Sequence, residues 1–183
     1  MFLSLSIALA ADPRVWLETG FTASAGVNEA TEPGGGFAGG FGVALGKEPA
    51  RSFAFVARAR EGLSGEDLRH VGNLGFTVRY PADRGPWVAA GLAHNHETPA
   101  DVALRNPVGT AFAVERGITH RTGFEVGAGW DFAPPFPEHR LSARVLPRVG
   151  VSAVVLPDAG GPPVYVVADA GIRFGLDRIF RDL

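Results

Sequence analysis

Four histidines are the residues whose spacing in this chain fits metal chemistry most closely. His94 and His96 are two residues apart, so on a β-strand their rings lie on the same face. A hairpin built around a turn at 81–85 would bring position 70 opposite position 96, with Glu97 adjoining. Imidazole nitrogens are ligands that Zn²⁺ and Cu²⁺ accept. The candidate ligands of a metal site at the rim of a sheet are therefore His70, His94, His96 and His120. Water-exposed histidines that bind nothing are the ordinary alternative.

Other kinds of reaction chemistry find little support. The sequence has no GxSxG, no phosphate-binding loop and no HExxH. It also has no cysteine, which excludes a disulfide framework and a thiolate metal site. We therefore expect a protein that is not an enzyme and carries no cofactor, with an enzyme or metal binder at the histidine-bearing rim as the alternative.

Ten charged residues recur at positions that alternate with apolar ones, and they include four carboxylates and six arginines. They are Glu18, Arg58, Arg60, Arg79, Glu125, Asp131, Arg144, Arg148, Asp169 and Arg173. If this polar face is enclosed, arginines should bridge carboxylates bidentately, because an unpaired buried charge is costly. The set predicts a salt-bridged network that fills an interior. A pore selective for a small solute is the other interpretation.

The segment from Phe124 to Phe132, FEVGAGWDF, indicates which element positions these charges. Its bulky or small apolar residues alternate with glycines and carboxylates, and a period of two indicates a strand with two unlike faces. A polar face of glycine and carboxylate suits a cramped interior opposite an apolar exterior. This is the inside-out arrangement of a transmembrane β-barrel.

The same alternation recurs along the chain and predicts eight strands of an all-β, antiparallel up-and-down barrel. Their ranges are 15–25, 37–45, 52–60, 73–80, 87–96, 124–132, 141–155 and 164–176. An even number lets the barrel close with both termini on one side. The connections 27–36, 62–69, 97–120 and 156–163 then lie on the other side.

The stretch 97–120 is expected to be a long surface loop with one or two short helices. Thr98-Pro99-Ala100-Asp101 has the pattern of a helix cap, with proline in the first turn and a carboxylate two residues later. Asn106-Pro107 repeats the signal, and Gly117 lies where a helix would stop.

The pattern over residues 14–176 resembles the small, eight-stranded outer-membrane β-barrel proteins of Gram-negative bacteria. The resemblance implies an outer-membrane location, contact with lipid, and insertion by the barrel-assembly machinery. Members commonly end in an aromatic residue that this machinery reads, whereas this chain has Phe174 and Phe180 but ends in Leu183. Lipid A deacylases of this kind use His, Ser and Glu at the rim. Here only His120-Arg121-Thr122 and Glu125 are comparable, without the serine, so that activity is not transferred.

Composition sets the remaining bounds. The chain has 183 residues and a net charge of −2, which gives no electrostatic basis for binding nucleic acid. Lys47 is the one lysine against sixteen arginines, which disfavours a large water-facing surface. Residues 1–10, MFLSLSIALA, are expected to be a secretory signal without its charged start, followed by a single domain over 11–183. A structural or surface-interaction role is expected, with a soluble lipocalin-like barrel for an apolar ligand as the further alternative.

Overall fold

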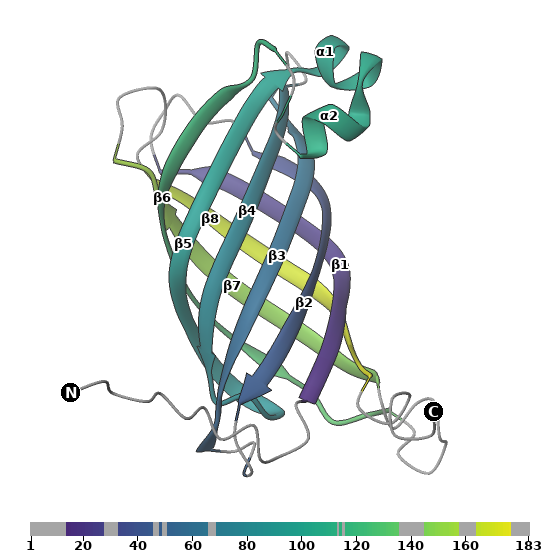
Figure 1. The fold of residues 1–183 in the computed structure, drawn as a ribbon, viewed down its shortest axis with the longest axis vertical. Helices are drawn as coiled ribbons and strands as arrows, with labels where there is room; N and C mark the ends of the chain where they lie inside the picture. The colour runs from purple at the N-terminus through teal and green to yellow at the C-terminus, as the bar shows by residue number, and fades with distance from the viewer. Residues whose placement is uncertain are drawn as a thin grey trace, which may run out of the picture.

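The fold is a closed barrel of eight antiparallel strands, each paired with its neighbours in the sequence (Figure 1). The computed structural model describes residues 14–27, 33–45, 48, 51–65, 69–112, 114, 116–135, 145–157 and 164–176. The expected signal segment 1–10 lies outside these residues. The strands are β1 (Arg14–Gly26), β2 (Gly34–Leu45), β3 (Phe53–Ser64), β4 (Arg69–Tyr80), β5 (Gly85–Pro99), β6 (Thr119–Asp131), β7 (Val145–Val155) and β8 (Val164–Gly175).

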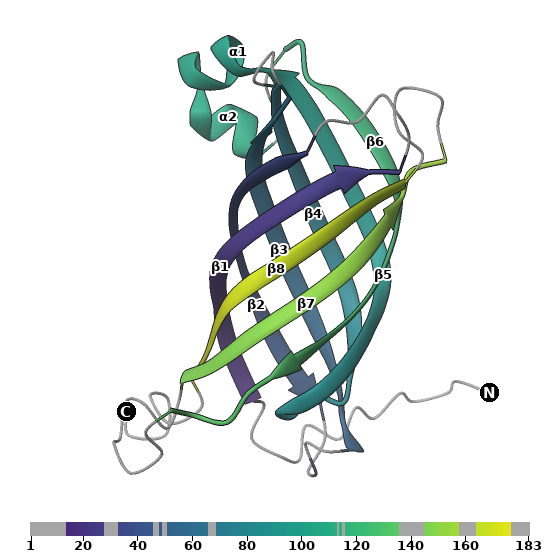
Figure 2. The same ribbon diagram turned by 180° about the vertical axis from the view of Figure 1, so that it is seen from behind.

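This architecture confirms the predicted fold class and strand number. β1 starts and β8 ends at the same end of the barrel, and these two strands pair to close it (Figures 1 and 2). The end opposite to them, where β1 joins β2 and β5 joins β6, is called the loop side below.

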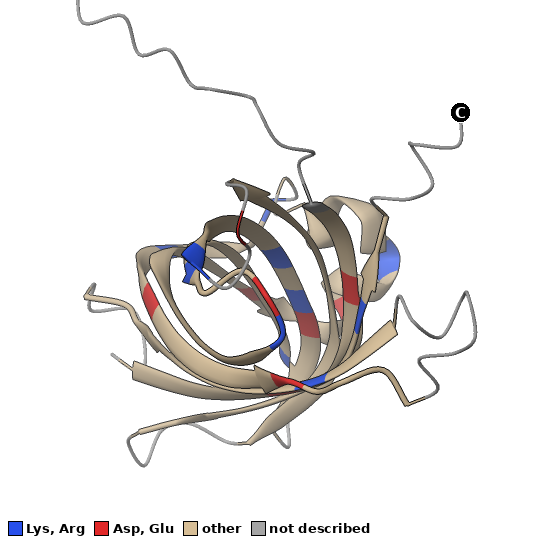
Figure 3. Ribbon diagram, turned by 90° about the horizontal axis from the view of Figure 1, so that it is seen from below, with Lys and Arg blue, Asp and Glu red and all other residues tan. Residues whose placement is uncertain are grey.

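The alternation of residue types produces the two faces of the wall. Phe21 and Phe76, at outward positions, are 68% and 61% exposed, whereas the inward Trp16 is 1% exposed. Figure 3, seen from below along the barrel, shows that acidic and basic positions recur around the wall. The soluble alternative requires the Phe-rich faces to enclose a ligand, but the structure has them on the exterior.

Five strands, β2 to β6, extend at least three residues further on the loop side than the alternation indicates. β3 continues to Ser64 and β4 begins at Arg69, so part of the stretch 62–69 that was expected to be a loop is strand. β5 continues to Pro99 and β6 begins at Thr119, and these polar ends pair through Glu97 and Thr119. Backbone hydrogen bonding between strands does not require an apolar face. The strands therefore pair beyond the last residue of the alternating apolar pattern.

The predicted register of the β4–β5 hairpin is wrong by two residues. Tyr80 pairs with Val88, which places His70 opposite Thr98 and His96 opposite Gly72. The centre of the turn therefore lies one residue later than the sequence interpretation assumed.

The connection between β5 and β6 contains the expected short helices, α1 (Ala100–Arg105) and α2 (Pro107–Ala111). Asn106 caps α2 by accepting a hydrogen bond from the Gly109 amide at 3.0 Å. α1 packs against β4 and β5, and both helices lie outside the barrel at its loop side (Figures 1 and 2). Neither helix is long and apolar enough to cross a membrane.

Candidate functional site

The barrel lumen contains the predicted charges. Arg144 lies outside the described residues, and the other nine face inward. Arg58 has a side chain that is 11% exposed, and the remaining eight residues are buried: Glu18, Arg60, Arg79, Glu125, Asp131, Arg148, Asp169 and Arg173. Strand parity placed all nine on the correct face. The ion pairs among them form three clusters, around Arg60, Glu18 and Asp131.

The first cluster surrounds Arg60 in the middle of the lumen. One guanidinium nitrogen, Nη2, lies 2.8 Å from Glu125 Oε1 and 2.8 Å from Asp169 Oδ2. Nη1 donates to Asn73 Oδ1 at 3.1 Å, and Nε donates to Asp169 Oδ1 at the same distance. Arg60 thus links β3 to β6 and β8, which lie far apart around the barrel.

The second cluster surrounds Glu18 on β1. Arg58 Nη2 lies 2.8 Å from Glu18 Oε2, and Arg148 also forms an ion pair with this oxygen. A longer contact of 3.7 Å joins Arg58 to Asp169. The first two clusters are therefore continuous.

The third cluster surrounds Asp131 at the end opposite the loop side. Arg79 and Arg173 approach Asp131 Oδ2 at 2.7 and 2.9 Å. Trp87 Nε1 donates to Asp131 Oδ1 at 3.1 Å. The guanidinium carbon of Arg173 lies 3.7 Å from the centre of the Trp16 ring, a cation–π contact.

The sequence reasoning did not assign the two tryptophans to this network. Trp16 also donates to Glu18 Oε1 at 2.9 Å, and its ring occupies the space over Gly42, where a Cβ would overlap it. The sequence signal that could have predicted this assignment is their parity, because both tryptophans are at inward-facing positions of their strands, as Glu18 is.

Two small cavities lie beside these side chains. A cavity of about 30 Å³ lies on the loop side of Arg60, among Thr22, Asn73 and Tyr165. A second, of about 10 Å³, lies beside Glu18 and Asp169. Volumes of this size hold about one or two water molecules.

The four predicted histidines also come together, in a row on the outer face of the wall at its loop side. The ring centroids of His70 and His96 are 5.7 Å apart, those of His96 and His94 are 6.2 Å apart, and those of His94 and His120 are 5.3 Å apart. His120 belongs to β6 rather than to the connection before it. Metal binding by this row stays a prediction.

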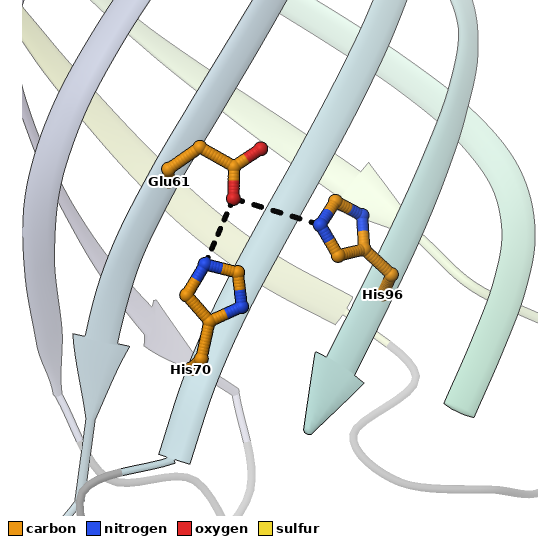
Figure 4. A group of neighbouring side chains, drawn as sticks. All are labelled: Glu61, His70 and His96. Atoms are coloured by element: carbon orange, nitrogen blue, oxygen red, sulfur yellow. Dashed lines mark ion pairs between the residues drawn. The ribbon is translucent and has the colours of Figure 1, made fainter. Parts of the chain in front are cut away.

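The row divides into a pair on the surface and a pair that contacts Glu61. His94 Nε2 and His120 Nδ1 are 3.2 Å apart on the surface. His70 and His96 instead turn toward Glu61, whose Oε2 lies 2.9 Å from His70 Nε2 and 3.5 Å from His96 Nε2 (Figure 4).

Glu61 is the residue that the sequence reasoning missed here. It pairs with Gly72 across β3 and β4, and Gly72 pairs with His96 across β4 and β5, so the three positions form one cross-strand row. The correct strand register would have predicted this contact, but the β4–β5 turn was predicted at the wrong position. Glu97, expected beside the histidines, has the opposite parity, and it accepts a hydrogen bond from Tyr165 Oη at 2.8 Å in the lumen.

The burial of His96 is unusual for its position. Leu92, on the same strand face four residues earlier, is 60% exposed, whereas His96 is 0% exposed. The wall changes from exposed to covered at the point where α1 packs on β4 and β5. The histidine–glutamate group is therefore a partly covered site on the outside of the barrel.

Comparison with known proteins finds similarity of fold. No model of a protein family matches the chain, and no curated protein matches it. The crystal structure of Ail, the attachment invasion locus protein of Yersinia pestis, matches with a TM-score of 0.51 and 12% identity, over 89% of this chain and 99% of Ail. The Neisserial surface protein A, NspA, matches with a TM-score of 0.52 and 12% identity, over 90% of this chain and 97% of NspA. The chain thus has the fold of the small eight-stranded β-barrel proteins of the Gram-negative outer membrane.

Proposed function

We propose that this chain is a non-enzymatic outer-membrane protein whose lumen is closed by its ion-pair network and whose role is exerted at the cell surface. The observation that carries the proposal is the pairing of an apolar exterior with an interior of buried, ion-paired charges. Water-soluble barrels have the reverse arrangement.

The exterior supports contact with lipid. Phe41, Phe76, Leu92 and Phe124 occupy one continuous cross-strand row and are each at least 50% exposed. Soluble monomers rarely expose apolar patches beyond a few hundred Å². A closed barrel also satisfies the backbone hydrogen bonds of every strand, which the bilayer requires.

The interior supports a closed lumen. The carboxylates of Glu18, Glu125, Asp131 and Asp169 each contact at least one arginine. Arginine side chains span from wall to wall, and the cavities between them hold only a few waters. An eight-stranded barrel is about wide enough for such side chains and little more.

A surface-interaction role is supported by the connection that carries α1 and α2. It presents Leu104, Val108, Phe112 and Val114, which are 68% to 82% exposed, on the loop side. The similar Ail is an attachment invasion locus protein and NspA is a surface protein. We propose that these apolar side chains contact a surface partner.

Planar-bilayer recording of the purified, full-length protein tests the closed lumen. The wild type should give no steady conductance. A matched variant, Arg58→Ala with Arg60→Ala, empties the centre of the lumen and should give measurable current if it still inserts as a barrel. A stable, ion-selective current from the wild type would favour the pore instead.

Adhesion tests the surface role. Bacteria that display the wild type should adhere to cultured epithelial cells more than bacteria that display Leu104→Ser with Phe112→Ser, at equal surface amounts. Equal adhesion by both strains, or by cells without the protein, would contradict a role for this connection in attachment.

A further inference from the structure

We infer that Glu61, His70 and His96 form a binding site for one divalent first-row transition cation, of which Zn²⁺ is the natural probe. The three side chains lie together over the strands (Figure 4). The site is on the outer wall of the barrel, where α1 packs on β4 and β5. This inference does not depend on the membrane location or on the closed lumen.

The positions of the three ligand atoms fit a tetrahedral ion. Bonds of about 2.0–2.1 Å to nitrogen and oxygen place neighbouring ligands of Zn²⁺ about 3.3 Å apart. Glu61 Oε2 lies 2.9 Å from His70 Nε2 and 3.5 Å from His96 Nε2. The available ligand atoms all lie within 4.8 Å of one another. Small rotations of the side chains would complete the coordination geometry.

The polar atoms of the group have no other use among the described residues. Neither oxygen of Glu61 and neither ring nitrogen of His96 has a hydrogen-bond partner there, and His70 Nδ1 also lacks one. Glu61 Oε2 contacts the two imidazoles as ion pairs at 2.9 and 3.5 Å. Leaving a buried polar group unsatisfied is unfavourable. A cation coordinated by Oε2 and the two Nε2 atoms would give Glu61 Oε2 and His96 Nε2 a partner.

The backbone at Gly72 makes the arrangement possible. This glycine lies between Glu61 and His96 in the cross-strand row. A Cβ there would overlap the His96 ring and come within 2.7 Å of Glu61 Oε2. Because Gly72 has no side chain, the carboxylate of Glu61 and the imidazole of His96 can approach each other over its backbone.

The ligand set determines which ions fit. Two imidazoles and one carboxylate suit Zn²⁺, Cu²⁺ or Ni²⁺ rather than Ca²⁺ or Mg²⁺, which prefer oxygen. Three protein ligands leave a fourth position for water or a small anion. The side chains of Glu61 and His70 are 27% and 13% exposed, whereas both carboxylate oxygens of Glu61 are buried.

The neighbouring pair His94 and His120 is not part of this ligand set. Both are on the surface, and their ring nitrogens face each other at 3.2 Å. The four-histidine site expected from the sequence is thus narrowed to two histidines and one glutamate. The pair provides matched controls, because His94→Ala and His120→Ala remove an imidazole from the same face.

Titration of the full-length protein in detergent with Co²⁺, followed by displacement with Zn²⁺, tests the inference. One Co²⁺ should bind per chain, with the intense visible bands of a tetrahedral site. Glu61→Gln and His96→Ala should weaken binding at least about tenfold, since even changes to residues that merely orient ligands cost about 10–100-fold. Gly72→Ala should do the same by displacing His96. His94→Ala and His120→Ala should leave the affinity unchanged.

Each variant is first checked for the heat-dependent gel mobility of a folded barrel, so that lost binding is not lost folding. Absence of Co²⁺ and Zn²⁺ binding by the wild type would overturn the inference. It would also be overturned if binding survives Glu61→Gln and His96→Ala but disappears with His94→Ala or His120→Ala. That result would assign adventitious binding to the exposed pair.

Discussion

At the scale of single residues, Arg60 is the side chain that holds the lumen network together. Its replacement by methionine leaves the carboxylates of Glu125 and Asp169 buried without their main partner. Removing one member of a buried ion-pair network typically costs about 3–5 kcal/mol. We expect Arg60→Met to lower the free energy of unfolding by that amount, measured by urea titration of protein folded into lipid vesicles.

The control for this prediction removes the stranded carboxylates as well. Arg60→Met combined with Glu125→Gln and Asp169→Asn should recover most of the lost stability, because neutral partners need less compensation. If the single and triple variants are equally destabilised, packing rather than charge pairing accounts for the role of Arg60.

Phe55 tests the apolar exterior at the same scale. It is 56% exposed on the outer face of β3. Arginine on the lipid face costs about 2–4 kcal/mol near the bilayer midplane and about 0–1 kcal/mol near the interfaces. Phe55 is the third residue of β3, so Phe55→Arg should show a loss between these limits in the same unfolding assay. Phe112→Arg, at a residue 71% exposed on the loop-side connection, should change stability little. Similar effects of both substitutions would contradict lipid contact at Phe55.

Residue positions were predictable from sequence where parity alone determines them. The lumen arginines and carboxylates alternate with apolar residues, so their face followed directly from the period of two. The contact of Glu61 with the histidines could not be predicted in this way, because it depends on the register between three strands. A turn misplaced by one residue shifts that register by two, and it put position 70 rather than Gly72 opposite His96.

At the scale of elements, the connection with α1 and α2 is the segment that differs most from the barrel wall. The Arg105 side chain is 79% exposed at the end of α1. Exposed connections are where proteolytic nicking concentrates. Trypsin added to intact cells should therefore cut within 97–120, at Arg105 or Arg116, and leave two fragments held together by strand pairing.

The lumen arginines serve as an internal control for this digestion, because they are buried and should remain uncut. Arg105→Gln with Arg116→Gln should protect the chain. Cleavage within 97–120 that occurs only after cell disruption would place this connection on the periplasmic side and contradict the proposed orientation.

Element types were predictable because local signals and the global fold agree here. The Asn106-Pro107 pair predicted a helix start, and Asn106 caps α2. The ends of β5 and β6 were not predictable, since Glu97 and Thr119 extend the ladder without an apolar face. Strand existence thus followed from side-chain pattern, while strand length followed from backbone pairing that the pattern does not encode.

At the scale of the whole molecule, the network and the wall depend on each other. Arg60 joins β3 to β6 and β8, and Arg148 joins β7 to β1, so the ion pairs brace strands that do not pair directly. We propose that the interior contributes to stability and that the interactions with partners take place on the loop side. The Glu61, His70 and His96 group lies there too, outside the barrel and separate from the lumen charges.

The apolar exterior of the barrel should face lipid. Fractionation of cells that express the full-length chain, followed by carbonate washing of the membranes, tests this most directly. The protein should stay in the washed outer-membrane fraction and run as a compact, heat-modifiable barrel on a gel. A monomer that remains in the soluble periplasm without detergent would contradict it.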